Sequence, residues 1–209
     1  MNFSRSAEII AEFLESNHDL MPSSISKLAP TDRESKIEDK LKNAFHKTDR
    51  PRSPSTVPDH VVSMILEGFY GYPTERLEAM KKEHQDAMAA ENVVGGLLER
   101  YLAEELMTQG WVWCCGETVR KIDFIKREKN GFIALQVKNR DNTENSSSSA
   151  IRAGTEIKKW FRTKSRTGES NWEKFPDEGA KSKLSEIGFR EFVTRRMNMV
   201  KEVVADRPD

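Results

Sequence analysis

The sequence predicts an α/β fold in which a mixed β-sheet is flanked by helices. Three observations support this fold class. Apolar residues recur at helical spacing in several segments before Gly110. Three short segments rich in aromatic and β-branched residues follow, and another helical segment comes near the end of the chain. This order of helices, strands and helix is typical of one sheet covered by helices.

Length and composition exclude several classes of protein. The chain has 209 residues, 36% of them hydrophobic, and no run approaches the ~20 apolar residues of a membrane-spanning helix. The N-terminus lacks the small-residue cleavage site of a secretory signal, so we expect a cytoplasmic protein without a membrane partner. The two cysteines, Cys114 and Cys115, are adjacent, and we expect both to be buried rather than to bind zinc or form a disulfide.

The first 60 residues are predicted to form an N-terminal helix followed by a Pro/Ser-rich arm. Residues 5–16 place Ile9, Ile10, Phe13 and Leu14 on one helical face. Residues 21–59 are polar and contain three prolines after residue 50, so we expect a linker there. Residues 61–209 are expected to form the main domain, with a helical entry and a C-terminal helix.

The helical entry contains two start signals. Asp59 can cap a helix that ends near Gly71, and Pro73-Thr74 precede a second helical pattern that continues to Gly110. Because that pattern is long for one globular helix, we expect a break near residues 84–86.

The strands are expected in WVWCCGE, VRKIDFIKRE and GFIALQVKNR. Asn130-Gly131 is the strongest signal for a two-residue hairpin turn, and this turn would place Asp123 opposite Lys138. A polar loop from Arg140 follows. We expect a helix from Ile151 or Thr155 through IKKWFRT, and a final helix over residues 182–205.

The predicted hairpin gathers polar side chains on one face. Because side chains alternate along a strand, Asp123, Gln136 and Lys138 share a face, opposite to Phe124 and Leu135. A carboxylate and an amide oxygen can hold a hard divalent ion, and a lysine can orient or deprotonate a water molecule. Oxygen ligands favour Mg²⁺, with Mn²⁺ as a substitute, over zinc. The alternative is an exposed cross-strand ion pair without chemistry.

Asp123 followed by QVK at 136–138 resembles the PD-(D/E)XK nuclease superfamily, with Gln136 in place of the commoner carboxylate. The resemblance implies catalytic roles for Asp123, Gln136 and Lys138. It also implies a glutamate from the preceding helix, for which Glu99 is the candidate and Glu91 the alternative. Asp123, Gln136 and Glu99 would then hold the metal.

The whole chain is neutral, with 34 basic and 34 acidic residues, but a local basic segment follows the hairpin. Residues 151–168 contain six cations and one anion, interleaved with Trp160 and Phe161. Hydroxyl and amide side chains precede this segment. Hydroxyls, amides and cations are the groups that contact phosphates and base edges in nucleic acids. The alternative is a solvated helix face with Trp160 in the core. The candidate DNA-binding residues are Arg140, Asn142, Ser147, Arg152, Lys158, Lys159, Arg162, Lys164 and Arg166.

Residues 88–176 resemble the SinI-type family of type II restriction endonucleases, through AAENVVGGLLERYLAEEL, GWVWCCGETVRKIDFI, LQVKNRDNTENSSSSAIR and GTEIKKWFRTKSRTGESNWEKFP. The resemblance implies magnesium-dependent double-strand cleavage of DNA within GGWCC, in a PD-(D/E)XK nuclease domain. A palindromic site favours a homodimer, for which the N-terminal helices are the candidate surface. A cognate DNA methyltransferase would be a functional partner. The alternatives are a structure-specific nuclease of repair or recombination and a non-catalytic DNA-binding module.

Overall fold

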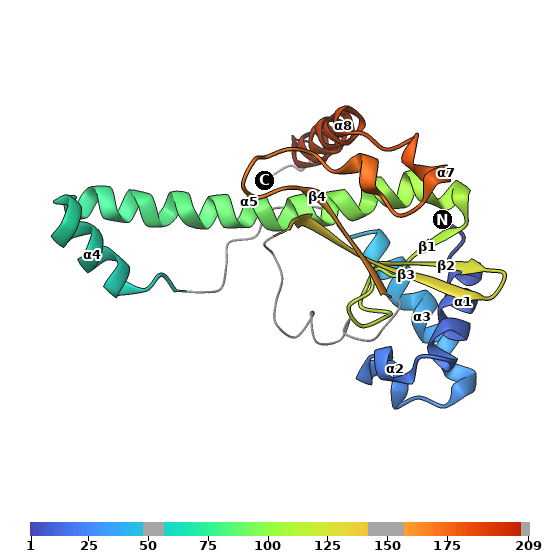
Figure 1. Ribbon diagram of the computed structural model, residues 1–209. Coiled ribbons are helices and arrows are strands. Elements are labelled where there is room, and N and C mark those ends of the chain that lie inside the picture. Colours follow the sequence, from blue (N-terminus) through green and yellow to red (C-terminus); the bar gives the residue numbers. More distant parts are fainter. Residues whose placement is uncertain (48–56, 142–156, 206–209) are drawn as a thin grey trace. The chain divides into compact units, whose positions relative to one another are not determined.

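The computed structural model describes residues 1–47, 57–141 and 157–205, with side chains described up to residue 199. The chain divides into two units, one of Met1–Thr48 with Leu98–Asp209 and one of Asp49–Leu97. This division does not follow the boundary predicted between residues 60 and 61. The elements (Figure 1) are α1 Phe3–Glu15, η1 His18–Leu20, α2 Ser23–Ser26, α3 Pro30–Phe45, α4 His60–Tyr70, α5 Thr74–Leu106, η2 Met107–Gln109, β1 Trp111–Trp113, β2 Phe124–Glu128, β3 Gly131–Arg140, β4 Ile157–Thr163, η3 Trp172–Lys174, α7 Glu178–Lys181 and α8 Glu186–Ala205.

The predicted mixed sheet is confirmed. Its described strands lie in the order β1-β2-β3-β4; β1, β2 and β3 pair antiparallel, and β4 pairs parallel with β3. Figure 1 shows these strands, within the larger unit, beside the C-terminal end of α5 from Leu98 and between the N-terminal helices and α8. The three predicted strands correspond to β1, β2 and β3, and the predicted C-terminal helix corresponds to α8, which begins four residues later than expected.

The predicted hairpin turn is displaced by one residue. Glu128 pairs with Gly131, so the two-residue turn is Lys129-Asn130, and Gly131 has a φ of 132° at the start of β3. Phe124 consequently pairs with Leu135, and the continuation of this register places Asp123 opposite Gln136 rather than Lys138. The error shifts the pairing by two residues, so every side chain keeps its predicted face.

The helix predicted through IKKWFRT is wrong, because these residues form β4. The strand pairs with β3 from Ala134–Ile157 to Arg140–Thr163. Trp160 is almost completely buried, and its indole N–H donates to the carbonyl of Asn171 at 3.0 Å. Pairing with a distant strand therefore determines the conformation of this segment, and the basic side chains alternate between the two faces of a sheet. The polar loop predicted before it falls mostly on residues 142–156, outside the described residues.

Two further helical predictions are wrong. Residues 30–45, predicted as part of a linker, form α3, whose Ile37 and Leu41 are buried. The break expected near residues 84–86 is absent, since α5 is one helix of 33 residues. No proline lies within α5, so its length alone did not justify two helices.

The larger unit has apolar packing on both faces of its sheet. On one side, α1 packs with α3, and Phe13 meets Phe132 of β3 edge to face with ring centroids 5.4 Å apart. On the other side, Trp160 packs against Trp172 and Phe175. Cys114 and Cys115 are buried, as predicted, and both are free. Packed side chains therefore cover both faces of the sheet around β3, the central strand on which the candidate site depends.

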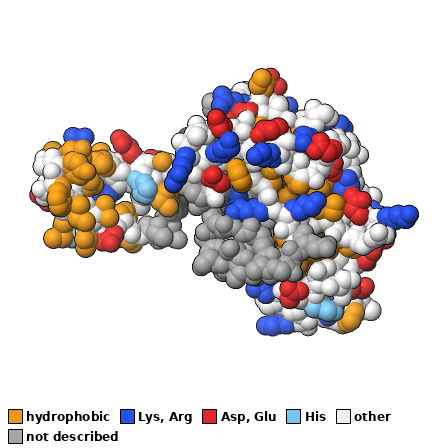
Figure 2. Space-filling model, in the orientation of Figure 1, with side chains coloured by type: hydrophobic (Ala, Val, Ile, Leu, Met, Phe, Trp, Pro, Cys, Tyr) orange, Lys and Arg blue, Asp and Glu red, His pale blue; other side chains and the backbone are white. Residues whose placement is uncertain are grey.

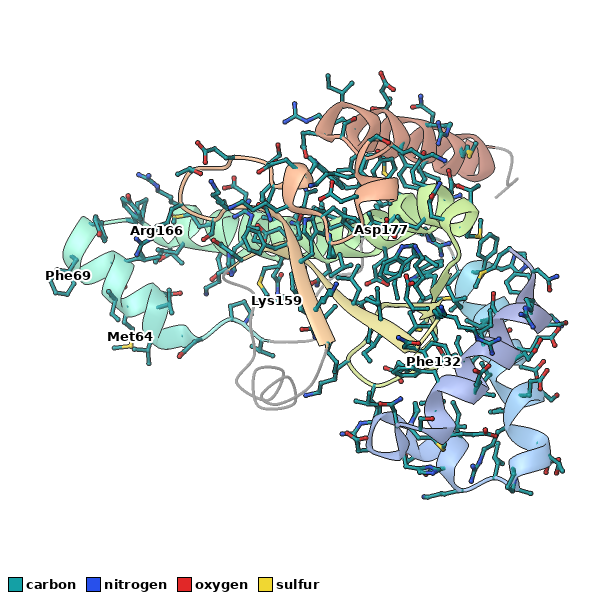
Figure 3. The ribbon with its side chains drawn as sticks, turned by 45° about the vertical axis from the view of Figure 1, so that its right-hand side comes forward. Met64, Phe69, Phe132, Lys159, Arg166 and Asp177 are labelled. Atoms are coloured by element: carbon teal, nitrogen blue, oxygen red, sulfur yellow. The ribbon has the colours of Figure 1, made fainter. Side chains whose placement is uncertain are left out.

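The smaller unit contains α4 and the first part of α5. Asp59 accepts a hydrogen bond from the Val61 N–H at 2.9 Å, and Gly71 ends α4 in the left-handed conformation, both as predicted. Figure 2 shows hydrophobic side chains gathered over α4, and Figure 3 shows Met64 and Phe69 projecting from it. Within the described residues, no helix combines the length and the apolar character needed to cross a membrane.

Candidate active site

Asp123 is fixed by hydrogen bonds to both neighbouring strands. Its backbone N–H donates to the carbonyl of Leu135 at 3.0 Å, and its own carbonyl accepts from the Cys114 N–H at 2.8 Å. Its carboxylate oxygen Oδ2 accepts a hydrogen bond from the backbone N–H of Val137 at 2.7 Å. The residue therefore has little freedom in either its backbone or its side chain.

Gln136 and Lys138 lie two residues apart on β3, so their side chains share a face of the sheet. Gln136 is only 3% exposed, and its Oε1 has no hydrogen-bond partner among the described residues. A buried amide oxygen without a partner is unfavourable by roughly 1–3 kcal/mol. A cation or water molecule bound at Oε1 would supply the missing partner and remove this unfavourable free energy.

Glu99, on the C-terminal part of α5, completes the group. Its Oε2 accepts a hydrogen bond from the indole N–H of Trp113 at 3.0 Å. The charges of Asp123 and Lys138 both influence the pKa of Glu99. The two carboxyl groups and the Lys138 ammonium therefore lie close enough to interact electrostatically. Glu91, the alternative glutamate on the same helix, is exposed and belongs to the other unit.

Both carboxyl groups are held above their ordinary pKa values. Burial, followed by the charge of Asp123, raises the pKa of Glu99 to about 8, against the opposing effects of the Trp113 hydrogen bond, Lys138 and Arg100. Burial also raises the pKa of Asp123 to about 6, against the Val137 N–H and Lys138. Burial and mutual repulsion disfavour the ionised forms of these two neighbouring carboxyl groups. A bound divalent cation would stabilise the ionised forms.

The donor set fits a hard metal ion. It consists of two carboxylates and one amide oxygen, which suit Mg²⁺ or Mn²⁺. Over the described ranges, no group of three or more His, Cys, Asp and Glu side chains is placed to hold a metal. The fit to a cation here consequently depends on the unpaired Gln136 oxygen as the third ligand.

The predicted DNA-binding residues lie on different faces and segments of the structure. Lys159 pairs with Gln136 in the parallel register and shares its face, and Arg140 lies on the same face at the end of β3. Figure 3 shows Lys159 on β4 and Arg166 in the segment that follows it. Lys164 forms a 2.7 Å ion pair with Glu169. Three of the candidates lie outside the described residues: Asn142, Ser147 and Arg152.

Arg162 and Lys158 project from the opposite face of β4. The guanidinium of Arg162 contacts both oxygens of Glu186, at 2.7 and 2.9 Å, and donates through Nε to Asn139 Oδ1 at 2.9 Å. A guanine contact by Arg162 would require these three bonds to break. Its interactions support a role in holding α8 against the sheet.

The sequence reasoning missed the groups that hold the site residues. Trp113, the Val137 N–H and Arg100 each influence Glu99 or Asp123. A main-chain donor has no signature in a sequence. The only available signal for Trp113 was the strand pattern of WVW, which does not indicate a partner on a helix.

A mixed sheet flanked by helices, with an aspartate, a glutamine and a lysine on its central hairpin, places the protein in the restriction-endonuclease-like class of folds. The chain belongs to the SinI restriction endonuclease family, which it matches over residues 3–199. It is 53% identical over 158 residues to the type II restriction enzyme Eco47I of Escherichia coli, covering 73% of this chain and 69% of that one. It is also 53% identical over 154 residues to the type II restriction enzyme SinI of Salmonella infantis, covering 73% and 67% of the two chains. The family resemblance found in residues 88–176 is thus confirmed, and the match extends to α1.

The raised carboxyl pKa values predict how the stability of the metal-free protein depends on pH. Both carboxyl groups hold protons more tightly in the folded chain than at the ordinary values of 3.8 for Asp123 and 4.5 for Glu99. Their contribution to stability is therefore greatest below about pH 4 and is lost as the pH rises toward about 6 for Asp123 and about 8 for Glu99.

Thermal unfolding from pH 4 to 8 in a chelating buffer tests this pH dependence. The variant with Asp123→Asn and Glu99→Gln should gain stability relative to the wild type as the pH rises. Mg²⁺ at pH 8 should raise the Tm of the wild type only. A constant difference between the two proteins across this range would contradict the prediction.

Proposed function

We propose that this chain makes magnesium-dependent double-strand breaks in DNA at a short palindromic GGWCC-like site. The observation that carries the proposal is the grouping of Glu99, Asp123 and Lys138 beside the unpaired oxygen of Gln136. Membership of a restriction endonuclease family supports it over a structure-specific repair nuclease. An acid–amide–lysine group of this kind also argues against a DNA-binding module without chemistry.

Glu99, Asp123 and Gln136 are the residues that would hold Mg²⁺ or Mn²⁺. Such an ion supplies Lewis-acid stabilisation of the charge that develops on the phosphate, and it favours ionisation of water. The Val137 N–H holds the Asp123 carboxylate in one orientation. Lys138, on the same face as Gln136, orients the attacking water through its ammonium or, as the neutral amine, accepts a proton from that water at Nζ. In its charged form it also lowers the cost of ionising both carboxyl groups.

The proposed assembly is a homodimer, because a two-fold symmetric site is matched by one subunit per half-site. The N-terminal helices are the candidate surface predicted from the sequence, but the exposed apolar residues of the smaller unit, on and just before α4, offer a stronger one. Seven large apolar residues of that unit are between 50% and 89% exposed. They are Val57, Val61, Val62, Met64, Ile65, Phe69 and Tyr70. A cognate DNA methyltransferase, acting on the same site without binding this chain, would protect the host DNA.

Cleavage of a supercoiled plasmid with a single GGWCC site tests the activity. The wild-type chain should convert it to linear DNA in Mg²⁺ or Mn²⁺ and do nothing in EDTA, because the proposed ligands need a hard cation. Sequencing of the ends should place both cuts within the site, and a plasmid without the site is the control. Undiminished cleavage after exhaustive chelation would exclude the mechanism.

Substitutions in the site should separate catalysis from DNA binding. Asp123→Ala and Lys138→Ala should each reduce the cleavage rate by more than about 100-fold, since charge stabilisation in the transition state is lost. Binding of the cognate duplex should change little. Glu99→Ala should behave in the same way, whereas Glu91→Ala on the same helix should cleave normally. Wild-type rates in Asp123→Ala would place the active site elsewhere.

Base reading is expected from arginines on the Gln136 face or in the segment after β4. Arg140→Ala or Arg166→Ala should lose discrimination at one base pair, by ~1–3 kcal/mol for a guanine fork. Lys159→Ala should instead weaken binding to all sequences and reduce its salt dependence. Arg162→Ala should mainly lower the Tm, because it removes the guanidinium that makes two hydrogen bonds to Glu186 and one to Asn139. Cleavage of a library of single-base variant sites measures the specificity, and unchanged profiles for Arg140 and Arg166 would assign base reading to other residues.

A further inference from the structure

Two tryptophans of β1 make the same kind of hydrogen bond to different carboxylates. Trp111 donates its indole N–H to Asp177 at 2.8 Å, and Trp113 donates to Glu99 at 3.0 Å. Both side chains are at most 5% exposed and, being two residues apart, project from the same face. Asp177 also binds Lys126 at 2.8 Å and caps α7. Its hydrogen bonds therefore serve the fold, whereas Glu99 belongs to the candidate active site.

The indole N–H is well suited to orient a metal-binding carboxylate. It donates a single hydrogen bond, accepts none and does not titrate, so it does not compete for a cation. Its bond is made to Oε2 of Glu99, and the remaining lone pairs of the carboxylate can still bind a cation. A glutamate has three side-chain torsions, and a fixed donor on one oxygen limits the positions that the other can reach.

The indole ring of Trp113 itself lies beside a charged side chain, that of Arg100. The guanidinium of Arg100 lies 5.4 Å from the centre of the Trp113 ring. Arg100 in turn donates hydrogen bonds to the carbonyls of Ala44, Phe45 and Lys47, at 2.8–3.1 Å, where α3 ends. A continuous set of contacts thus runs from the end of α3 through Arg100 and Trp113 to Glu99.

We propose that Trp113 is a positioning residue that holds Glu99 in the orientation needed to bind a divalent cation, and that Arg100 and the end of α3 keep its ring in place. The proposal rests on the proposed function, in which Glu99 is a metal ligand. It gives the N-terminal helices a role in the active site, although they contribute no ligand of their own.

Trp113→Phe and Trp111→Phe form a matched pair for the test. Each removes one buried indole N–H from one carboxylate on the same short strand. Mn²⁺ binding to the free protein, without DNA, is measured by calorimetry, and cleavage is measured as a function of Mg²⁺ concentration. Trp113→Phe should weaken Mn²⁺ binding by about 10–100-fold and raise the Mg²⁺ needed for half-maximal cleavage in proportion. Trp111→Phe should lower the Tm and leave both ion dependences unchanged.

Benzothienylalanine at position 113 keeps both rings and lacks the N–H, so it serves if Trp113→Phe does not fold. Wild-type Mn²⁺ affinity in the folded position-113 variants would overturn the positioning role, as would an equal loss of affinity in Trp111→Phe. The failure of the proposed function has a different result, because Asp123→Ala would then cleave at the wild-type rate. If Asp123→Ala is inactive while the position-113 variants bind Mn²⁺ normally, the positioning role alone is excluded.

Discussion

The site depends on the hydrogen bonds that fix Asp123 where β2 begins. Its backbone is bonded to Cys114 on one side and Leu135 on the other, and its carboxylate is bonded to the Val137 N–H. The same strand pairing that closes the sheet therefore orients the first candidate ligand. Because Val137 lies between Gln136 and Lys138, this bond also sets the position of Asp123 relative to the other two polar side chains of the hairpin. A change in the β2–β3 pairing would disturb all three side chains together.

The sequence was sufficient to place the polar residues of the candidate site on one face of the sheet, even though it did not give the correct turn. Periodicity of two along β3 places Gln136 and Lys138 together whatever the turn, and an error of two residues in the register leaves the faces unchanged. Glu99 could be predicted only from a family resemblance, since its proximity to Asp123 depends on how α5 packs. Trp113 could not be predicted, because its partner on α5 is defined by tertiary structure alone.

The elements that were predicted wrongly have local patterns that fit more than one structure. Residues 157–163 combine lysines with aromatic residues at a spacing compatible with a helix, and only pairing with the distant β3 makes them a strand. In α3 the buried residues Ile37 and Leu41 are separated by charged positions, so the segment appears polar when read in sequence. The basic residues of β4 were consequently assigned to one helical surface, whereas the sheet directs Lys159 toward the Gln136 face and Arg162 toward Glu186.

All four tryptophans of the chain are buried, and each uses its indole N–H. Three bind carboxylates, at Asp177, Glu99 and Glu186, and Trp160 binds a backbone carbonyl. Buried indoles usually find such a partner, but here the partners belong to α5, α8 and the segments between β4 and α8. The intrinsic fluorescence of the native chain therefore arises from shielded indoles at the junctions between the sheet and its covering segments. Its emission maximum is an optical measure of whether those junctions, including the one at Glu99, are closed.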